Sequence, residues 1–312
     1  MILVEEGQSP LILCLPHSGT AIPDAIEKRL NATGRLQVDL GWRLERIFDL
    51  HDDLDVTVLR SSISRYVIDV DTDHTAPATD PARTLCPTTT LDGKRIYQEG
   101  EEPGPTEAEQ RTLLFYAPFH KALRAQIDRL LRRHGKVIVL DCQSMRSHIK
   151  GVTDKGLPLV SVGTGGGVSC DPDLRDLLVG SFSGQEGFTV SVDEQTQGGF
   201  ITSTFGRPEQ GLHVMTLLLA QRSYLRHESP PFEPDKTRTG RLRAIVTDTV
   251  SRLLDWAAMP ARQAAATEPA ADAQETGTPE VDPVDPPALP RVGRATTAQV
   301  EDKPVTSVLV AE

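Results

Sequence analysis

Side chains that can move protons or bind ions stand at three places in this chain, each at the end of an apolar stretch. His17 follows residues 11–15, a cluster from Asp69 to His74 ends a second stretch, and Asp141 to Ser144 follow residues 136–140. A histidine in such a loop has the position of a metal ligand or a catalytic base. The alternative is a hydrogen-bonded loop histidine with a structural role.

The second cluster holds three carboxylates at alternating positions. If a strand continued through it, Asp69, Asp71 and Asp73 would share one face. Carboxylates on one face repel each other unless a cation or several donors compensate, which favours a binding site over a packed core. Arg65 stands four residues before Asp69, so it can neutralise that carboxylate or clamp a substrate carboxylate. The alternative is a strand end in solvent.

A third signal lies in the glycine-rich stretch 197–213. Glycines let the backbone approach a ligand closely, and Thr202, Arg207 and His213 add a hydroxyl, a cation and an imidazole at short range. These features favour an anion-binding loop, and the alternative is a tight turn before a helix. The loop 163–167 is also rich in glycine, but it lacks the spacing of a dinucleotide or P-loop motif.

The elements that must position these residues alternate between apolar strands and amphipathic helices. Continuous apolar strands between helices indicate a mixed, largely parallel sheet covered on both faces, with the chemistry at the carboxyl ends of the strands. We predict strands over 11–15, 56–59, 66–70, 136–140 and 189–192, and helices over 38–51, 106–133, 172–179, 208–226 and 237–258.

Composition narrows the class of protein. The 312 residues carry a net charge of -11, so broad nucleic-acid binding is not expected. No apolar run approaches the ~18 residues of a membrane span, and the first residues lack a secretory signal, which predicts a cytoplasmic protein. The four cysteines lack CxxC spacing, so a disulfide framework is not expected.

The chain divides by composition into two parts. Residues 1–258 form the predicted folded domain, whereas residues 259–312 are predicted to be a disordered, acidic tail rich in Pro and Ala, because they cannot bury enough apolar surface to fold. The alternative for the tail is a docking segment for a protein partner, through its apolar last residues.

The motifs in their order along the chain resemble N-formylglutamate amidohydrolases over residues 8–226. The quoted pieces are Pro16-His17-Ser18-Gly19-Thr20, Ser64–Asp69, Pro105–Glu109 with Tyr116 and His120, Leu140–Ser144, Ser169-Cys170, Gly198–Thr202 and Gly206-Arg207-Pro208 with His213. The resemblance implies a three-layer α/β/α sandwich like that of zinc carboxypeptidases and aspartoacylases. It also implies hydrolysis of the formyl amide of a small acidic substrate, with a divalent metal, zinc, that activates water.

The resemblance and the residue patterns together give a set of expected site residues. We expect metal ligands at His17, Asp71 and Gln143, catalytic residues at Asp69, Asp71 and His213, and substrate-binding residues at Arg65, Ser144, Thr202 and Arg207.

Several positions depart from the family pattern. An expected metal histidine is Gln143, a substrate-binding arginine is Thr72, and a glutamate that is a candidate general base is Leu218. In the family stretch Asp-x-Asp-Trp-His, the second aspartate is Gly41 and the histidine is Arg43. Two hypotheses follow: a divergent metal-dependent amide hydrolase, or a catalytically impaired binding or scaffolding protein that keeps the pocket.

Overall fold

The computed structural model describes residues 2–76 and 79–259, and a seven-stranded sheet forms its centre. The strand order is β1-β3-β2-β4-β7-β5-β6. The strands are β1 (Ile2–Glu5), β2 (Leu11–Leu15), β3 (Thr57–Ser61), β4 (Val137–Met145), β5 (Val160–Gly163), β6 (Val190–Val192) and β7 (Leu212–Ala220).

Four neighbouring strands of the sheet are parallel. β3, β2, β4 and β7 run in one direction, whereas β1 pairs with β3 and β5 pairs with β7 in antiparallel fashion. The carboxyl ends of the four parallel strands therefore meet at one edge. The register of the long central pair sets Asp141 beside Thr216 and Gln143 beside Leu218.

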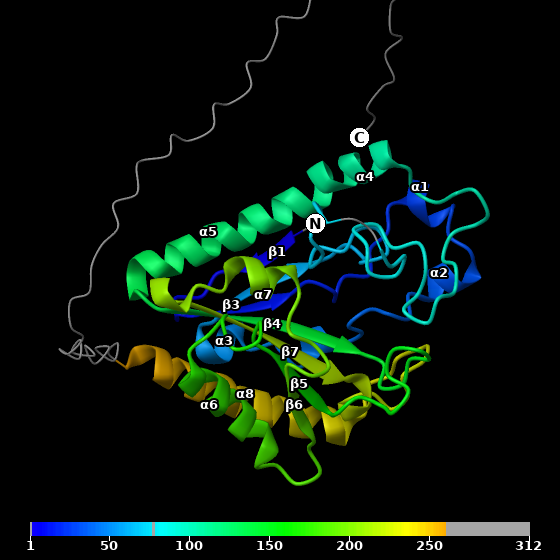
Figure 1. Cartoon of the computed structure of the whole chain (residues 1–312). Helices are drawn as coiled ribbons and strands as arrows, with labels where there is room; N and C mark the ends of the chain where they lie inside the picture. The colour runs from blue at the N-terminus through cyan, green and yellow to red at the C-terminus, as the bar shows by residue number, and fades with distance from the viewer. Residues whose placement is uncertain (1, 77–78, 260–312) are drawn as a thin grey trace, which may run out of the picture. The chain divides into compact units, whose positions relative to one another are not determined.

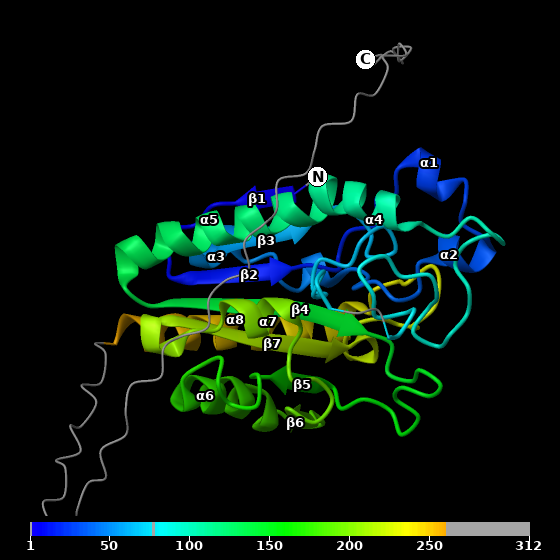
Figure 2. The same ribbon diagram turned by 45° about the horizontal axis from the view of Figure 1, so that its top comes forward.

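Helices cover both faces of the sheet, so the protein has three layers (Figures 1 and 2). One face carries α4 (Pro105–Arg111), α5 (Ala117–His134) and α7 (Phe200–Phe205), and the other carries α6 (Pro172–Ser183) and α8 (Lys236–Ala258). The short helices α1 (Asp24–Glu27), α2 (Ala32–Leu36) and α3 (His51–Leu54) lie in the connections. The predicted α/β/α sandwich with a mixed, largely parallel sheet is confirmed.

Two apolar clusters hold these layers together, one on each face of the sheet. Side chains alternate along the strands, so that β4 gives Val137 and Val139 to the cluster under α5 and Ile138 and Leu140 to the cluster under α8. Asp141 and Gln143 continue the first set, and therefore the polar end of β4 faces the α5 and α7 layer. Cys142 packs in the opposite cluster, as strand alternation predicts.

The helix predicted over 106–133 is formed by α4 and α5, joined by a π-helical turn at Thr112–Tyr116. Gly135 ends it in a left-handed conformation with φ of 72°. The predicted helices at 172–179 and 237–258 correspond to α6 and α8.

Three element predictions were wrong. Residues 66–70 form a turn and loop, in which Ser64 O accepts hydrogen bonds from the Val67 and Ile68 amides. Asp69, Asp71 and Asp73 consequently share no strand face. The stretch 208–226 contains β7, because its mostly apolar residues Leu212–Ala220 are all buried between β4 and β5. The stretch 38–51 contains only a 3-10 turn at Leu44–Arg46.

The predicted tail lies outside the described residues, so the boundary at 258 and the docking alternative stay predictions. The last described helix, α8, ends at Ala258. Among residues 2–76 and 79–259, the structure has no helix with the length and apolar character that a membrane crossing requires.

Candidate active site

A cavity of about 260 Å³ opens at the carboxyl ends of the parallel strands, on the side of the α5 and α7 layer. The loop after β2, the loop after β3, the end of β4 and the loop before α7 form its walls. Six residues predicted from the sequence line it: His17, Arg65, Asp69, Asp71, Gln143 and Ser144. The sequence thus located the cavity.

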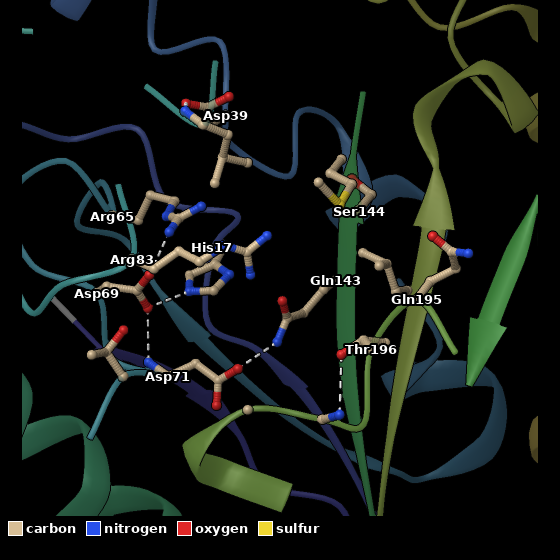
Figure 3. A pocket seen from close by; sticks show the side chains of 16 residues that line it. His17, Asp39, Arg65, Asp69, Asp71, Arg83, Gln143, Ser144, Gln195 and Thr196 are labelled. Atoms are coloured by element: carbon tan, nitrogen blue, oxygen red, sulfur yellow. Dashed lines mark hydrogen bonds and ion pairs between the residues drawn. The ribbon is translucent and has the colours of Figure 1, made fainter. Parts of the chain in front are cut away.

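His17 and Asp69 form a hydrogen-bonded pair at the base of this cavity (Figure 3). The His17 Nε2 atom lies 2.7 Å from Asp69 Oδ1, and Arg65 Nη2 donates to the other carboxylate oxygen over 2.6 Å. Asp69 is only 3% exposed. Although burial disfavours its charge, His17 and Arg65 hold the pKa of the Asp69 carboxyl well below its usual range. Asp69 is therefore an ionised acceptor, and Nε2 of His17 carries the hydrogen.

Next to the His17–Asp69 pair lie two further carboxyl groups, those of Asp71 and Asp141. Gln143 Nε2 donates to Asp71 Oδ2 and to Asp141 Oδ2, each over 2.7 Å. Asp71 Oδ1 accepts from the Ile201 amide at 2.8 Å, and its own amide donates to Asp69 Oδ1 at 3.0 Å. Asp71 therefore links both pairs, and Figure 3 shows it between Asp69 and Gln143.

The two carboxyl groups joined by Gln143 hold protons more tightly than ordinary aspartates. Burial and the nearby Asp141 charge raise the pKa of Asp71 to about 8. Burial raises the pKa of Asp141 to about 7, against the hydrogen bonds from Gln143 and Thr216. The structure thus places an ionised carboxylate, Asp69, beside a protonatable carboxyl, Asp71.

Asp141 lies behind the cavity wall and is fully buried. Its Oδ2 accepts from Thr216 Oγ1 at 2.9 Å, and Thr216 Oγ1 lies 2.7 Å from Thr202 Oγ1. Asp141 Oδ1 has no hydrogen-bond partner in the described part of the structure. Thr202 was expected to bind substrate, but it is 1% exposed. Its hydroxyl instead contacts that of Thr216, which donates to Asp141.

His213 and Arg207 do not reach the cavity, which corrects their predicted roles. His213 pairs with Ile138 near the amino end of β4, five positions from Gln143 and its partner Leu218. Its Nδ1 accepts from the Asp171 amide at the start of α6, and its ring packs edge-on against Trp256. Arg207 is exposed and donates to the Ser203 carbonyl oxygen. Arg207 precedes β7 and His213 is its second residue, so both lie at the amino end of that strand, whereas the cavity lies at the carboxyl end.

Two side chains of the α4–α5 layer fix the backbone around Asp71. Tyr116 donates its hydroxyl to Thr72 O at 3.0 Å, and His120 Nε2 lies 2.8 Å from Val70 O. These two bonds hold the residues directly before and after Asp71 in the chain. The resemblance motif that contains Tyr116 and His120 thus has a structural reason.

Arg83 and Gly199 are among the cavity residues for which sequence reasoning predicted no role. Arg83 lines the cavity with a side chain that is 58% exposed, and its ion pair with Asp80 is long, 3.7 Å. It is a cation with capacity for a substrate anion. A Cβ atom on Gly199 would lie 1.9 Å from Asp71 Oδ2, so only glycine allows this approach. The glycine-rich stretch was the available signal for Gly199.

Most of the positions that depart from the family pattern lie in or next to this cavity, whereas Arg43 does not line it. Leu218 and Thr72 line it. A Cβ atom on Gly41 would lie 3.3 Å from His17 O and 3.6 Å from Ser144 Oγ, so a longer side chain there would also enter the site. Thr72, Gln143 and Leu218 are therefore neighbours in space.

The side chains present do not fit the zinc ion that the resemblance implies. Zinc takes four ligands from thiolates, imidazoles and carboxylates. The expected set offers one imidazole and one carboxylate, while Gln143 points its NH₂ group at Asp71, and an NH₂ group cannot ligate. Both oxygens of Asp71 already accept hydrogen bonds. Among residues 2–76 and 79–259, no three His, Cys, Asp or Glu side chains are placed to hold a metal.

Comparisons with known proteins identify the family and agree with the fold. A sequence model of N-formylglutamate amidohydrolase matches residues 9–225. The chain is 32% identical over 254 residues to the N-formylglutamate deformylase of Pseudomonas aeruginosa, covering 81% of this chain and 95% of that protein. The Pseudomonas putida N-formylglutamate deformylase is 31% identical over 255 residues, with the same coverage.

Two solved structures share the fold. The crystal structure of N-formylglutamate amidohydrolase from Ralstonia eutropha JMP134 superposes with a TM-score of 0.65 at 20% identity, covering 82% of this chain and 97% of that one. A gene product from Agrobacterium tumefaciens gives a TM-score of 0.60 at 16% identity, covering 82% and 95%.

Proposed function

This chain belongs to the N-formylglutamate amidohydrolase family, and we propose that it hydrolyses a formyl-type amide of a small acidic substrate. The observation that carries the proposal is the pair of groups in one cavity: a histidine fixed by an ionised aspartate, and beside it a carboxyl with a raised pKa. Hydrolysis of an amide needs a base for water and an acid for the leaving nitrogen, and these groups supply both.

His17 is the proposed base. Asp69 accepts the hydrogen bond from Nε2–H, which leaves Nδ1 of His17 as the ring atom that can take up a proton. Nδ1 takes one proton from a water molecule while the water oxygen forms a bond to the amide carbon. Asp69 and Arg65 keep the ring in place during this step, and the Asp69 charge stabilises the imidazolium that forms.

Asp71 is the proposed acid. Its proton goes to the amide nitrogen as the C–N bond breaks, so that the nitrogen leaves as a neutral amine. The acid product then ionises, and its proton together with the proton on His17 restores Asp71 and releases one proton to solvent. Gln143 stabilises the Asp71 carboxylate formed during the step through the bond of 2.7 Å.

Arg83 is the proposed anchor for the acidic part of the substrate. Arg65 is committed to Asp69, whereas Arg83 reaches the cavity from an exposed loop. An arginine pairs with a carboxylate through two parallel hydrogen bonds, which also orients the substrate. Ser144, whose Oγ lies 2.7 Å from the Tyr224 hydroxyl, remains a proposed substrate contact.

The zinc ion stays a prediction from the family resemblance, and the donor set argues against it. No step above passes through a metal. The chemistry of the present side chains needs only His17, Asp69 and Asp71.

The second candidate is a binding or scaffolding protein that has lost catalysis. The observation in its favour is that Gln143 and Leu218, at positions where the family has a histidine and a glutamate, stand side by side in the cavity. A site without those two groups can still bind a small acidic molecule through Arg83.

One experiment separates the two candidates. Purified protein is incubated with N-formylglutamate, and formate is measured with a coupled dehydrogenase, with and without a chelator. We expect formate release that the chelator leaves unchanged and that His17→Asn and Asp71→Asn abolish. Binding of N-formylglutamate without formate release by the wild-type protein would favour the binding protein.

A further inference from the structure

A second cavity, of about 240 Å³, lies near the first but on a different wall of the loops. The loop after β2, the Trp42–Glu45 segment and the end of β3 enclose it. Its charged lining residues are Arg43, Arg60 and Glu45, and Ser18 and Thr20 add hydroxyl groups. None of these side chains has a part in the proposed hydrolysis. We call it the Arg43–Arg60 cavity.

Both arginines reach this cavity with hydrogen-bonding capacity unused. The Nε atoms of Arg43 and Arg60 are buried and have no hydrogen-bond partner in the described part of the structure. Neither guanidinium takes part in an ion pair with a described carboxylate, although most arginines near the first cavity do. The Nε atoms of Arg65 and Arg146 are also unpaired, but their guanidinium groups have carboxylate partners. Arg43 and Arg60 combine an unpaired Nε with no described carboxylate partner, which leaves this pair of cations with room for an acceptor.

The walls of the cavity are firmly built. Trp42 stacks on Phe232 with ring centroids 4.6 Å apart, and its Nε1 donates to Gln37 O at 2.8 Å. The Arg43 guanidinium lies 5.9 Å from the Trp42 ring. On the other wall, a Cβ on Gly19 would come within 2.3 Å of the Ser62 backbone, so the loop after β2 packs tightly against the end of β3. Arg60 is thus presented from β3, and Arg43 from a loop segment next to the stacked Trp42.

The charge balance selects an anion. Two guanidinium groups and one carboxylate line the Arg43–Arg60 cavity. A neighbouring cavity of about 220 Å³ shares Arg60 and Glu45, but it is lined by three carboxylates and two guanidinium groups. Of these two cavities, the Arg43–Arg60 cavity is the one with an excess of positive charge. Guanidinium groups with hydroxyl groups are the donors that bind the oxygens of phosphate and carboxylate groups.

From these observations we infer that the Arg43–Arg60 cavity binds a small oxyanion, a phosphate or carboxylate group, between its two arginines. The Ser18 Oγ atom, whose bond to Leu15 O is long at 3.4 Å, is free to turn toward the ligand. Ser61 contributes only its backbone, because its hydroxyl is bound to Ile63.

Isothermal titration calorimetry of the full chain tests the inference, with inorganic phosphate and succinate as two separate probes at about 0.1 M ionic strength. We expect at least one probe to bind. Arg60→Met and Arg43→Met should each weaken binding by about tenfold or more, because each removes a charge-assisted hydrogen bond. Glu45→Gln should strengthen binding by removing the carboxylate on the wall. The probe that binds identifies the source of the oxyanion.

Arg132→Met is the matched control, since Arg132 is exposed on α5 and lies outside both cavities. Hydrogen exchange locates the ligand: bound oxyanion should slow the amides of residues 18–20 and 60–62. Arg43 lies in a loop segment, so Arg43→Met gives a folded variant even if Arg60→Met unfolds. The inference is overturned if neither probe binds, if Arg43→Met binds as wild type, or if protection falls only on the first cavity.

Discussion

The side-chain amide of Gln143 donates to Asp71 over 2.7 Å, and the same nitrogen donates to Asp141 over 2.7 Å. Two buried carboxyl groups thus share one neutral NH₂ group, and each accepts from one further donor among the described residues, the Ile201 amide for Asp71 and the Thr216 hydroxyl for Asp141. Burial raises the pKa of both groups, and the neutral hydrogen bond from Gln143 only partly offsets this effect at Asp141.

The first prediction concerns metal content. We expect less than stoichiometric zinc in the purified wild-type protein, measured by inductively coupled plasma mass spectrometry after dialysis against zinc. The double variant Gly41→Asp/Gln143→His should gain stoichiometric zinc, because it adds a carboxylate and an imidazole beside His17. Gly41→Asp alone is the control. Stoichiometric zinc in the wild-type protein would show that the donor-set argument is wrong.

The second prediction uses the close approach of Gly199 to Asp71. Gly199→Ala places a methyl group 1.9 Å from Asp71 Oδ2, so the carboxyl must move and its bond to Gln143 is lost. We expect kcat to fall by about 100-fold or more, since a displacement of about 1 Å has such effects. The control is Gly180→Ala, where the added methyl has open space. Equal kcat in both variants would remove Asp71 from the mechanism.

The third prediction concerns the orientation of His17. Asp69→Asn replaces the ionised acceptor of the Nε2–H with an amide, so the ring loses its fixed tautomer. We expect kcat to fall by about 100-fold or more with a small change in KM. Rescue is informative: Asp69→Glu should recover part of the activity. Steady-state kinetics of formate release measures both constants, and an unchanged kcat in Asp69→Asn would contradict the role of His17 as base.

The fourth prediction assigns substrate affinity to Arg83. Arg83→Met should raise KM for an acidic N-formyl amino acid by about tenfold, whereas kcat stays within a few-fold, because the residue binds the anionic part away from the reacting amide. Arg83→Lys should fall between the two. The same substitution should leave KM for an uncharged N-formyl amide nearly unchanged, and a parallel rise for both substrates would indicate a general effect on the cavity.

The fifth prediction is a pH dependence of stability. Burial lowers the pKa of His120 to about 4, below the value of about 6.5 in an unfolded chain. Between these values the unfolded chain binds a proton that the folded protein does not, so the free energy of unfolding falls as the pH is lowered from about 6.5 to about 4. Below about 4 this contribution is constant.

His120→Gln removes this titration and keeps a donor for Val70 O. We expect urea unfolding to show a smaller loss of stability between pH 6.5 and 4 in the variant, by about 1 to 3 kcal/mol. At pH 7.5 the two proteins should differ little. Parallel pH curves for both proteins would mean that His120 is protonated in the folded state.

The sheet was predictable where apolar stretches are short and end in polar residues. Residues 11–15 and 136–140 became β2 and the first half of β4 for that reason. β7 was mistaken for a helix because a strand buried on both faces has no period of two, and its length of nine residues fits either element. Residues 66–70 are rich in β-branched residues, but Arg111 takes the Val67 carbonyl at 2.8 Å and holds a loop.

The site was predictable in so far as it rests on the carboxyl ends of parallel strands. That rule predicts His17 and Gln143 as site residues. Asp71 was predictable because it stands in the polar cluster from Asp69 to His74. His213 was misplaced because the error in β7 hid the direction of that strand. Arg83 carries no local signal, because its place in the cavity depends on how a long loop crosses the sheet edge.

The central strand pair also fixes the order in which the site can form during synthesis. Thr216 and its strand leave the ribosome 75 residues after Asp141, and their pairing with β4 adds the Thr216 hydrogen bond to the Asp141 carboxyl. Until then this carboxyl is hydrated and ionised like any aspartate. The free-energy cost of burying this carboxyl therefore arises when β7 pairs with β4. A nascent chain that ends before β7 contains the catalytic loops, but its site is incomplete.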